Sequence, residues 1–222
     1  MANLIITIDG PAASGKSTVA GLLAERLGAT FLDTGAMYRA ITLAAMKAGV
    51  DMSDEEKLLS ILDSRKFEFA SEKGKMIVSI DGVDVTEQIR GREVTTNAWH
   101  IASATKVRAK LVEMQREFAA GEDKIVTEGR DQGTVAFPNA DIKFYLTADT
   151  VERARRRQAE LNAQGGGSLE QIQKAIEERD RSDESRAVGP LKPASDAIVV
   201  DTTDLDIEEV VERLLRCVEE NA

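Results

Sequence analysis

The sequence has 222 residues, of which 42% are hydrophobic and 31% are charged, and its formal net charge at pH 7 is −10. This length predicts one domain with insertions, and the acidic balance argues against a protein that coats nucleic acid or binds anionic membranes. The single cysteine, Cys217, excludes an internal disulfide. We find neither a membrane-spanning apolar run nor a basic leader segment, so we expect a cytoplasmic protein.

The first predicted elements are a strand over residues 3–9 and a helix over residues 16–28, joined by a glycine-rich loop. In such a loop successive backbone amides surround phosphate oxygens at the positive end of a helix. Lys16 can reach the β- and γ-phosphates, and the hydroxyl of Ser17 can bind Mg²⁺, which makes it the predicted metal ligand. The predicted phosphate-binding residues are Gly10, Pro11, Ala12, Ala13, Ser14, Gly15, Lys16, Ser17 and Thr18. The loop alone does not separate a kinase from a GTPase, an ATPase or a silent nucleotide binder.

The elements that follow predict an α/β fold with a small antiparallel insertion. A strand over residues 30–33 and two helices lead into residues 66–85, where apolar residues alternate with polar ones and glycines supply turns, as in hairpins. The later strands are separated by helices, which indicates a parallel sheet. The predicted helices are 35–48, 54–63, 92–119, 150–163, 168–182 and 206–219, and the remaining strands are 124–128, 142–147 and 197–201.

The only glycine run, residues 164–168, separates two polar helices and favours a mobile helical lid, with a plain surface linker as the alternative. Arginines gather on either side of it: Arg153, Arg155, Arg156 and Arg157 precede the run, and Arg179, Arg181 and Arg186 follow the second helix. Guanidinium groups bind phosphates bidentately and stabilise the charge that spreads during phosphoryl transfer. Solvated helix faces are the alternative for Arg155 and Arg181.

Neither a general base nor a zinc site is evident. The only histidine, His100, falls in a predicted amphipathic helix, where a structural or exposed role is the simpler interpretation. A phosphate acceptor is already nucleophilic and needs no base. Asp33 ends a strand beside the loop, where it can approach Mg²⁺ through water, cap the next helix, or do both.

From end to end the chain resembles the bacterial cytidylate kinases, a branch of the nucleoside monophosphate kinases. The matching segments are residues 8–18, 32–39, 107–108, 128–138 and 178–191. The resemblance implies a P-loop core with a five-stranded parallel sheet, and transfer of the γ-phosphate of ATP, with Mg²⁺, to CMP or dCMP. The implied parts are a core (1–35, 99–150, 184–222), an acceptor-nucleotide domain (36–98) and a lid with flanking helices (151–183). We expect a monomer with no polymeric nucleic acid or membrane as partner.

The resemblance also implies roles for individual residues. The expected catalytic residues are Lys16, Arg130, Arg153, Arg157, Arg179 and Arg186, with Arg153 and Arg157 clamping the transferred group. The expected substrate-binding residues are Thr34, Tyr38, Arg39, Trp99, Arg108, Arg130, Asp131, Arg179, Asp183 and Arg186. Among them Arg39, Arg130 and Arg186 hold the acceptor phosphate, Arg179 and Asp183 lie near its sugar and phosphate, and Thr34, Arg108 and Asp131 face the base.

The chain departs from the family pattern at two positions that bear on the site. Glu128 stands where many members have aspartate, which keeps the carboxylate on a longer side chain. Trp99 stands where members often have a serine that contacts the base, and an indole there can stack on a base or turn into the core. Two other hypotheses therefore remain open: a kinase with a different small acceptor, and a nucleotide-binding module without catalysis.

Overall fold

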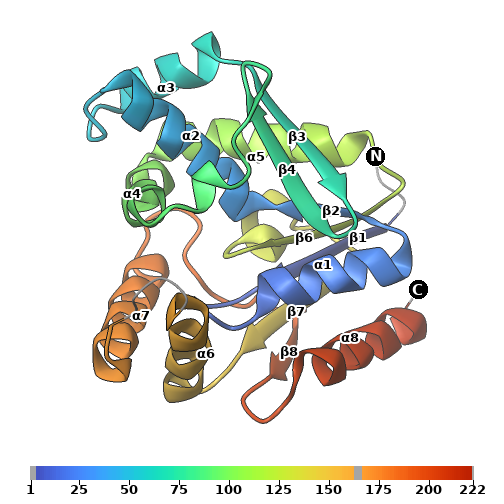
Figure 1. Cartoon of the computed structure of the whole chain (residues 1–222). Helices are drawn as coiled ribbons and strands as arrows, with labels where there is room; N and C mark the ends of the chain where they lie inside the picture. The colour runs from blue at the N-terminus through green and yellow to red at the C-terminus, as the bar shows by residue number, and fades with distance from the viewer. Residues whose placement is uncertain (1–3, 163–166, 222) are drawn as a thin grey trace.

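The computed structural model, which describes residues 4–162 and 167–221, is built on a five-stranded parallel sheet (Figure 1). Its strands are β1 (Leu4–Asp9), β2 (Thr30–Asp33), β6 (Lys124–Gly129), β7 (Ile142–Thr147) and β8 (Ile198–Asp201), in the order β2-β6-β1-β7-β8. β1 is central and pairs with β6 and β7. The predicted parallel sheet is therefore confirmed, and the phosphate loop leaves its middle strand.

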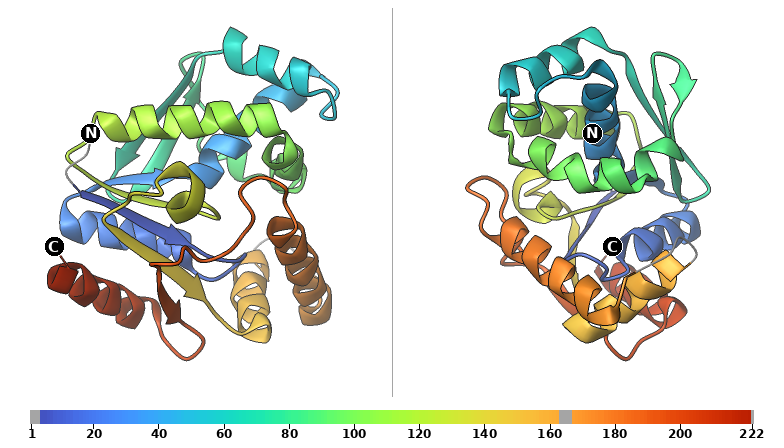
Figure 2. Two further views of the ribbon diagram at one scale, coloured as in Figure 1. Left: turned by 180° about the vertical axis from the view of Figure 1, so that it is seen from behind. Right: turned by 60° about the vertical axis from the view of Figure 1, so that its left-hand side comes forward.

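Helices cover both faces of this sheet, as Figure 2 shows from two sides. Because neighbouring residues of a strand point to opposite faces, Phe31 and Leu32 enter different cores. Phe31 packs with α1 (Lys16–Leu27) and α8 (Ile207–Asn221), whereas Leu32 packs with α2 (Thr34–Ala48) and α5 (Thr105–Ala120). Inner strands such as β6 are thus buried on both faces, whereas the edge strand β8 leaves Val199 exposed.

A second, antiparallel sheet lies beside the edge strand β2. It consists of β3 (Phe67–Glu72), β4 (Lys75–Ile80) and β5 (Val83–Asp84), as the alternation in residues 66–85 predicted. The Phe31 amide donates to Ser71 Oγ at 3.0 Å, which satisfies a group on the edge of β2. At the hairpin tip Gly74 meets Gly21 of α1, where an added Cβ would lie 2.4 Å from the Gly21 carbonyl oxygen. Backbone thus contacts backbone, and the insertion is fixed to the phosphate-loop helix.

Four further helices and a 3-10 turn complete the described fold. The helices α3 (Glu55–Ser64) and α4 (Arg92–Ser103) join the core of α2, and the 3-10 turn η1 (Gln88–Arg90) precedes α4. On the other side α6 (Thr150–Asn162) packs on α7 (Leu169–Glu184) around Ala154, Ile172 and Ile176. Residues 164–166 of the glycine run (164–168) that favoured a mobile lid lie outside the described residues.

Two local predictions were wrong or incomplete. The helix predicted over residues 92–119 is two helices, α4 and α5, separated at Ala104, whose backbone is extended (φ −76°, ψ 106°). The segment after β6 also forms a π-helical turn, η2 (Gln132–Ala136), that the sequence pattern did not indicate. Within residues 4–162 and 167–221, no helix is long and apolar enough to cross a membrane.

Candidate active site

The phosphate loop connects β1 to α1 at the carboxyl edge of the sheet, and two of its glycines are required. A Cβ on Gly10 would lie 2.1 Å from the Leu146 carbonyl oxygen, so the loop passes against β7 with no room for a side chain. Gly15 has φ +83°, which an L side chain rarely adopts, directly before α1 begins at Lys16. The loop therefore presents its backbone amides at the N-terminus of α1, as the sequence predicted.

Lys16, Ser17 and Glu128 form the polar floor of this loop. The Lys16 ammonium is buried and donates to the Pro11 carbonyl oxygen at 3.1 Å. Burial and the nearby Arg130 lower the pKa of Lys16 to about 7. Ser17 Oγ donates to Glu128 Oε1 at 2.7 Å, and burial raises the pKa of that carboxyl group. A hydroxyl and a carboxylate oxygen are ligands that Mg²⁺ prefers, so this pair fits a metal held beside a triphosphate.

At the end of β6, two arginines, Arg130 and Arg186, share the carboxylate of Asp183. Arg130 Nε donates to one oxygen of Asp183 at 2.8 Å, and Arg186 Nη2 donates to the other. Burial opposes the charge on Asp183, but the two arginines prevail and hold its pKa below the usual range. Arg130, Asp183 and Arg179 all lie close enough to Lys16 to influence its pKa. Three of the predicted acceptor-side residues, Arg130, Arg179 and Asp183, thus lie near the end of the phosphate loop.

Asp33 organises two more arginines on the other side of β6. Its carboxylate accepts from the Ala36 amide at 2.8 Å and so caps α2, which confirms the cap predicted for it. The same carboxylate pairs with Arg39 at 3.1 Å and lies 3.8 Å from Arg90, a residue that sequence reasoning missed. Arg39 Nε is buried and has no hydrogen-bond partner among the described residues, so this donor is available to a ligand.

Arg108, Asp131 and Tyr38 form the wall predicted to face the base. Arg108 and Asp131 are a buried ion pair, and the Arg108 guanidinium lies over the Tyr38 ring, 5.7 Å from its centroid. Gly189 (φ +62°) covers the pair so closely that a Cβ there would lie 2.0 Å from Asp131 Oδ2. Thr34, which is also predicted to face the base, is buried beside β6, where its hydroxyl donates to the Glu128 carbonyl oxygen at 2.8 Å.

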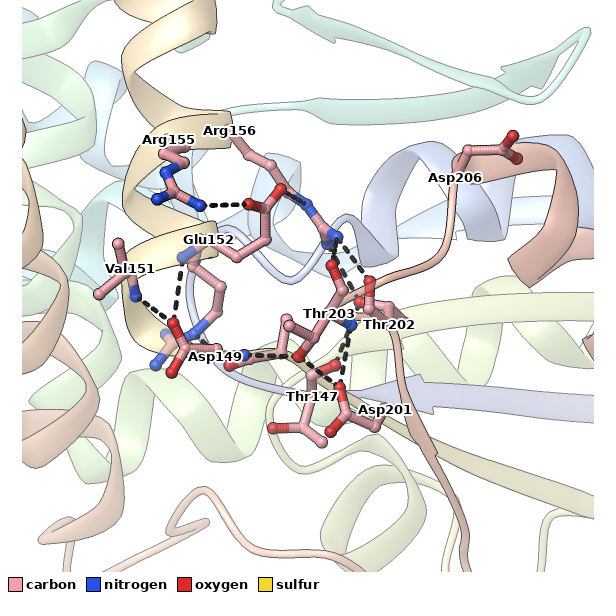
Figure 3. A network of polar contacts seen from close by, with 12 residues as sticks. Thr147, Asp149, Val151, Glu152, Arg155, Arg156, Asp201, Thr202, Thr203 and Asp206 are labelled. Carbon is pink, nitrogen blue, oxygen red and sulfur yellow. Dashed lines mark hydrogen bonds and ion pairs between the residues drawn. The ribbon is translucent and has the colours of Figure 1, made fainter.

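The arginines of α6 point in three directions. Arg153 is buried and donates to the Ala12 carbonyl oxygen at 3.0 Å and to Asp180, so it ties α6 and α7 to the phosphate loop. Arg156 binds the carbonyl oxygen of Thr202 at 2.6 Å, and Figure 3 shows it inside the polar network at the base of α6. Arg157 pairs with Glu160 at 2.7 Å. Helical spacing places Arg153, Arg156 and Arg157 on one side of α6, but their long side chains turn to different partners.

Arg179 and Trp99 are both exposed. Arg179 lies on α7, where loss of solvent on its protein side and repulsion from Arg130 lower its pKa to about 10. Trp99 on α4 is 55% exposed and stacks on His100, with ring centroids 3.8 Å apart. Trp99 is therefore not a core residue, and one of the two orientations considered for the indole is removed.

Sequence reasoning missed three residues that hold the site together: Asp9, Arg90 and Asp180. Asp180 accepts from the Ala12 amide at 3.1 Å, and Asp9 accepts from two amides of η2. Their partners lie far away in the sequence, so helical or strand periodicity does not point to them. Asp9 and Asp180 do fall within the matching segments 8–18 and 178–191. Asp9 is also a charged residue at the end of an apolar strand, where burial must be compensated.

Comparison with known proteins decides the family. The family model described as cytidylate kinase matches residues 6–220. A cytidylate kinase of Geobacillus kaustophilus is 48% identical over 216 residues, covering 97% of this chain and 96% of the relative. The chain belongs to the cytidylate kinase family. A cytidylate kinase of Stutzerimonas stutzeri is 46% identical, with 95% and 93% of the two chains covered.

Solved structures agree with the fold of a cytidylate kinase at much lower identity. A shikimate kinase from Bacteroides thetaiotaomicron has a TM-score of 0.50 at 16% identity, with 97% of this chain and 98% of that chain covered. A gluconokinase from Sinorhizobium meliloti has the same score at 15% identity, with 98% and 95% covered. The expected P-loop core and the expected class, an ATP-dependent nucleoside monophosphate kinase, are confirmed.

Proposed function

We propose that this chain transfers the γ-phosphoryl group of ATP to the phosphate of CMP or dCMP, releasing ADP and the corresponding diphosphate. The observation that carries the proposal is the convergence of two phosphate-binding sets. Lys16 and Ser17 begin α1, directly after the loop that leaves β1. Arg130, which pairs with Asp183 of α7, follows the end of β6, the strand paired with β1. Such a convergence suits a donor and an anionic acceptor held together.

The transfer requires charge stabilisation rather than proton abstraction. An oxygen of the acceptor phosphate attacks the γ-phosphorus, and the bond from that phosphorus to the oxygen bridging to the β-phosphate breaks. Lys16 follows the charge that develops on the γ-phosphoryl oxygens, while Arg39, Arg130 and Arg186 neutralise the acceptor phosphate. Ser17 with Glu128 would hold Mg²⁺, which would supply electrostatic stabilisation of the phosphate charge.

The remaining site residues complete the proposal. Arg108 and Asp131 present donors and an acceptor to the base, Tyr38 supports Arg108, and Thr34 stands beside them. Arg179 contacts the sugar and phosphate of the acceptor. Arg157 clamps the γ-phosphoryl group when the lid closes, after leaving Glu160, and Arg153 supports the phosphate loop from behind. We further propose the core, acceptor and lid division stated above, a monomeric state, and a cytoplasmic location, where both nucleotides are present.

A second candidate is a kinase of the same class with a different acceptor, and the exposed indole of Trp99 is the observation that favours it. An indole at the edge of the base pocket gives apolar area to any flat ring, whereas a hydroxyl selects by hydrogen bonding. The two candidates share every phosphate contact and differ only at the base.

ADP release with MgATP and one acceptor at a time (CMP, dCMP, UMP or AMP) tests the proposal, for the native chain and for Trp99→Ser. We expect kcat/KM to be highest for a cytidine nucleotide. Turnover of UMP or AMP alone would favour the second candidate. Binding of ATP without transfer to any monophosphate would reject both and leave a non-catalytic module.

A further inference from the structure

Asp9 is a buried carboxylate that the phosphate chemistry described above does not use. It is the last residue of β1, directly before the phosphate loop, and only 3% of its surface is exposed. Its strand neighbours are Gly129 on β6 and Tyr145 on β7. Burying a carboxylate on the central strand of a sheet costs free energy unless its oxygens accept hydrogen bonds. The groups that bond to Asp9 therefore indicate what this side chain stabilises.

The partners of Asp9 are two consecutive amides at the start of η2. Oδ1 accepts from the Gln132 amide at 2.9 Å, and Oδ2 accepts from the Gly133 amide at 2.8 Å. Gly133 allows this approach, because a Cβ there would lie 2.9 Å from Thr7 Oγ1 on the same strand. The carboxylate therefore acts as a two-pronged acceptor that holds the backbone of η2 against β1.

The two amides follow immediately after Arg130 and Asp131, which bind Asp183 and Arg108 respectively. Fixing the backbone at Gln132 fixes the direction in which both preceding side chains leave the end of β6. Asp9 also begins the turn into the phosphate loop. One side chain thus connects the loop that holds the donor to the two residues that face the acceptor.

The opposite end of η2 is held separately, by Arg116 of α5. Arg116 Nε donates to the Ala136 carbonyl oxygen at 2.8 Å, and its Nη2 donates to the Val135 carbonyl oxygen at 2.9 Å. Arg116 therefore makes the same number of backbone contacts with η2 as Asp9, but at the end far from Arg130 and Asp131. A substitution of Arg116 is therefore a matched control, because it weakens the turn η2 without altering the end next to Arg130 and Asp131.

We propose that Asp9 is a positioning residue that sets the acceptor-binding residues Arg130 and Asp131 in register with the phosphate loop. The inference rests on the proposed function and goes beyond it, because both oxygens of Asp9 are occupied by backbone amides of η2. Asparagine in its place has one acceptor oxygen and an amide donor that faces a backbone N–H. Replacement by asparagine thus loosens the acceptor side while leaving the loop sequence intact.

Separate titrations of the native chain, Asp9→Asn and Arg116→Gln with CMP and with MgATP test the proposal. Burial raises the pKa of Asp9 to about 7, although the two amide hydrogen bonds lower it. The experiment is therefore run at pH 8, where most of the carboxylate is ionised. For Asp9→Asn we expect the Kd and KM for CMP to rise about tenfold or more, as loss of one buried hydrogen bond predicts. Its Kd for MgATP should stay within about twofold, and Arg116→Gln should lower the melting temperature without a selective loss of CMP affinity.

Equal weakening of CMP and ATP binding in Asp9→Asn, an unchanged CMP affinity, or an equal CMP loss in Arg116→Gln would overturn the role of Asp9. Failure of the native chain to phosphorylate any cytidine nucleotide would instead reject the proposed function. If Asp9→Asn does not fold, Gly133→Ala displaces the same amides by contact with Thr7 and leaves Asp9 in place. Gly133→Ala should show the same selective loss for CMP, and unaltered CMP binding in that variant would equally contradict the proposal.

Discussion

Ser17 Oγ donates to Glu128 Oε1 at 2.7 Å, which joins the first turn of α1 to the end of β6. The contact places the predicted metal ligand of the phosphate loop against a buried carboxylate. Glu128 also lies beside Lys16, whose charge lowers the pKa of the carboxyl group against the effect of burial. The proposed donor half of the site therefore contacts a residue of β6, the strand that leads to the proposed acceptor half.

Glu128→Gln keeps the shape of this contact and removes its charge. We expect kcat to fall about 10- to 100-fold, and the Mg²⁺ concentration for half-maximal activity to rise, because residues around a metal ligand tune its affinity on this scale. Activity measured across a Mg²⁺ series checks this. Glu122→Gln is the control, because Glu122 accepts from the Thr30 hydroxyl at 2.5 Å at the opposite end of the sheet. The same Mg²⁺ dependence in both variants would contradict the role of Glu128.

Arg186→Ala removes one of the two arginines on Asp183 and leaves Arg130 in place. We expect kcat/KM for CMP to fall about 10²- to 10³-fold, because a preorganised cation on the reacting phosphate is lost. The Arg186 side chain is only 16% exposed, but Arg130 remains to pair the buried Asp183 carboxylate, so the melting temperature should change little. Arg181→Ala, which removes an exposed arginine of α7, should leave the kinetics unchanged. Unaltered kinetics for Arg186→Ala would remove this residue from the site.

The lowered pKa of Lys16 leads us to expect that the protein takes up a proton when ATP binds. This pKa is lowered to about 7 by burial and by Arg130, so at pH 8 most of the ammonium is deprotonated before the nucleotide binds. The phosphates favour the charged form and raise that pKa, so binding takes up nearly one proton at pH 8 and much less at pH 6. Calorimetry in buffers of different ionisation enthalpy measures the uptake. Uptake that is equal at both values, or that persists in Lys16→Met, would contradict this assignment.

Gly189→Ala places a methyl group on the buried ion pair of the base wall. The new Cβ would lie 2.0 Å from Asp131 Oδ2 and 2.3 Å from Arg108 Nη2. We expect CMP affinity to fall while ATP affinity is kept, with a stability loss of about 1–3 kcal/mol. Gly49→Ala has the same positive φ but open space around its Cβ, so it should cost only the backbone strain. Calorimetry with each nucleotide and thermal melts separate these effects.

The elements with strong local patterns were predictable, and their interruptions were not. The strand at residues 30–33 and the strand at residues 142–147 have the predicted bounds, because β-branched and aromatic runs between turns specify buried strands. The break at Ala104 is invisible to periodicity, because Ile101 and Val107 are buried in one core and continue the apolar pattern across it. The turn η2 is held by Asp9 and Arg116, and neither is near it in sequence.

In the candidate site, too, the features set by local sequence were predictable and those set by distant contacts were not. The loop residues Lys16 and Ser17 lie where the motif places them, because backbone geometry at Gly10 and Gly15 determines the loop. The positions of the α6 arginine side chains were not predictable in this way, because the partners of a long guanidinium side chain depend on tertiary contacts. Arg156 contacts Thr202 rather than the phosphate side, and helical spacing contains no information on that choice.

The most direct test of the central claim is to follow the label from [γ-³²P]ATP in the presence of Mg²⁺ and CMP, and to separate the products. The convergence of Lys16 with Arg130 and Asp183 predicts that the label appears in CDP, in step with ADP release. It also predicts that Arg186→Ala slows this transfer without diverting the label. Label that appears only as inorganic phosphate, or that stays in ATP at saturating CMP, would contradict the claim.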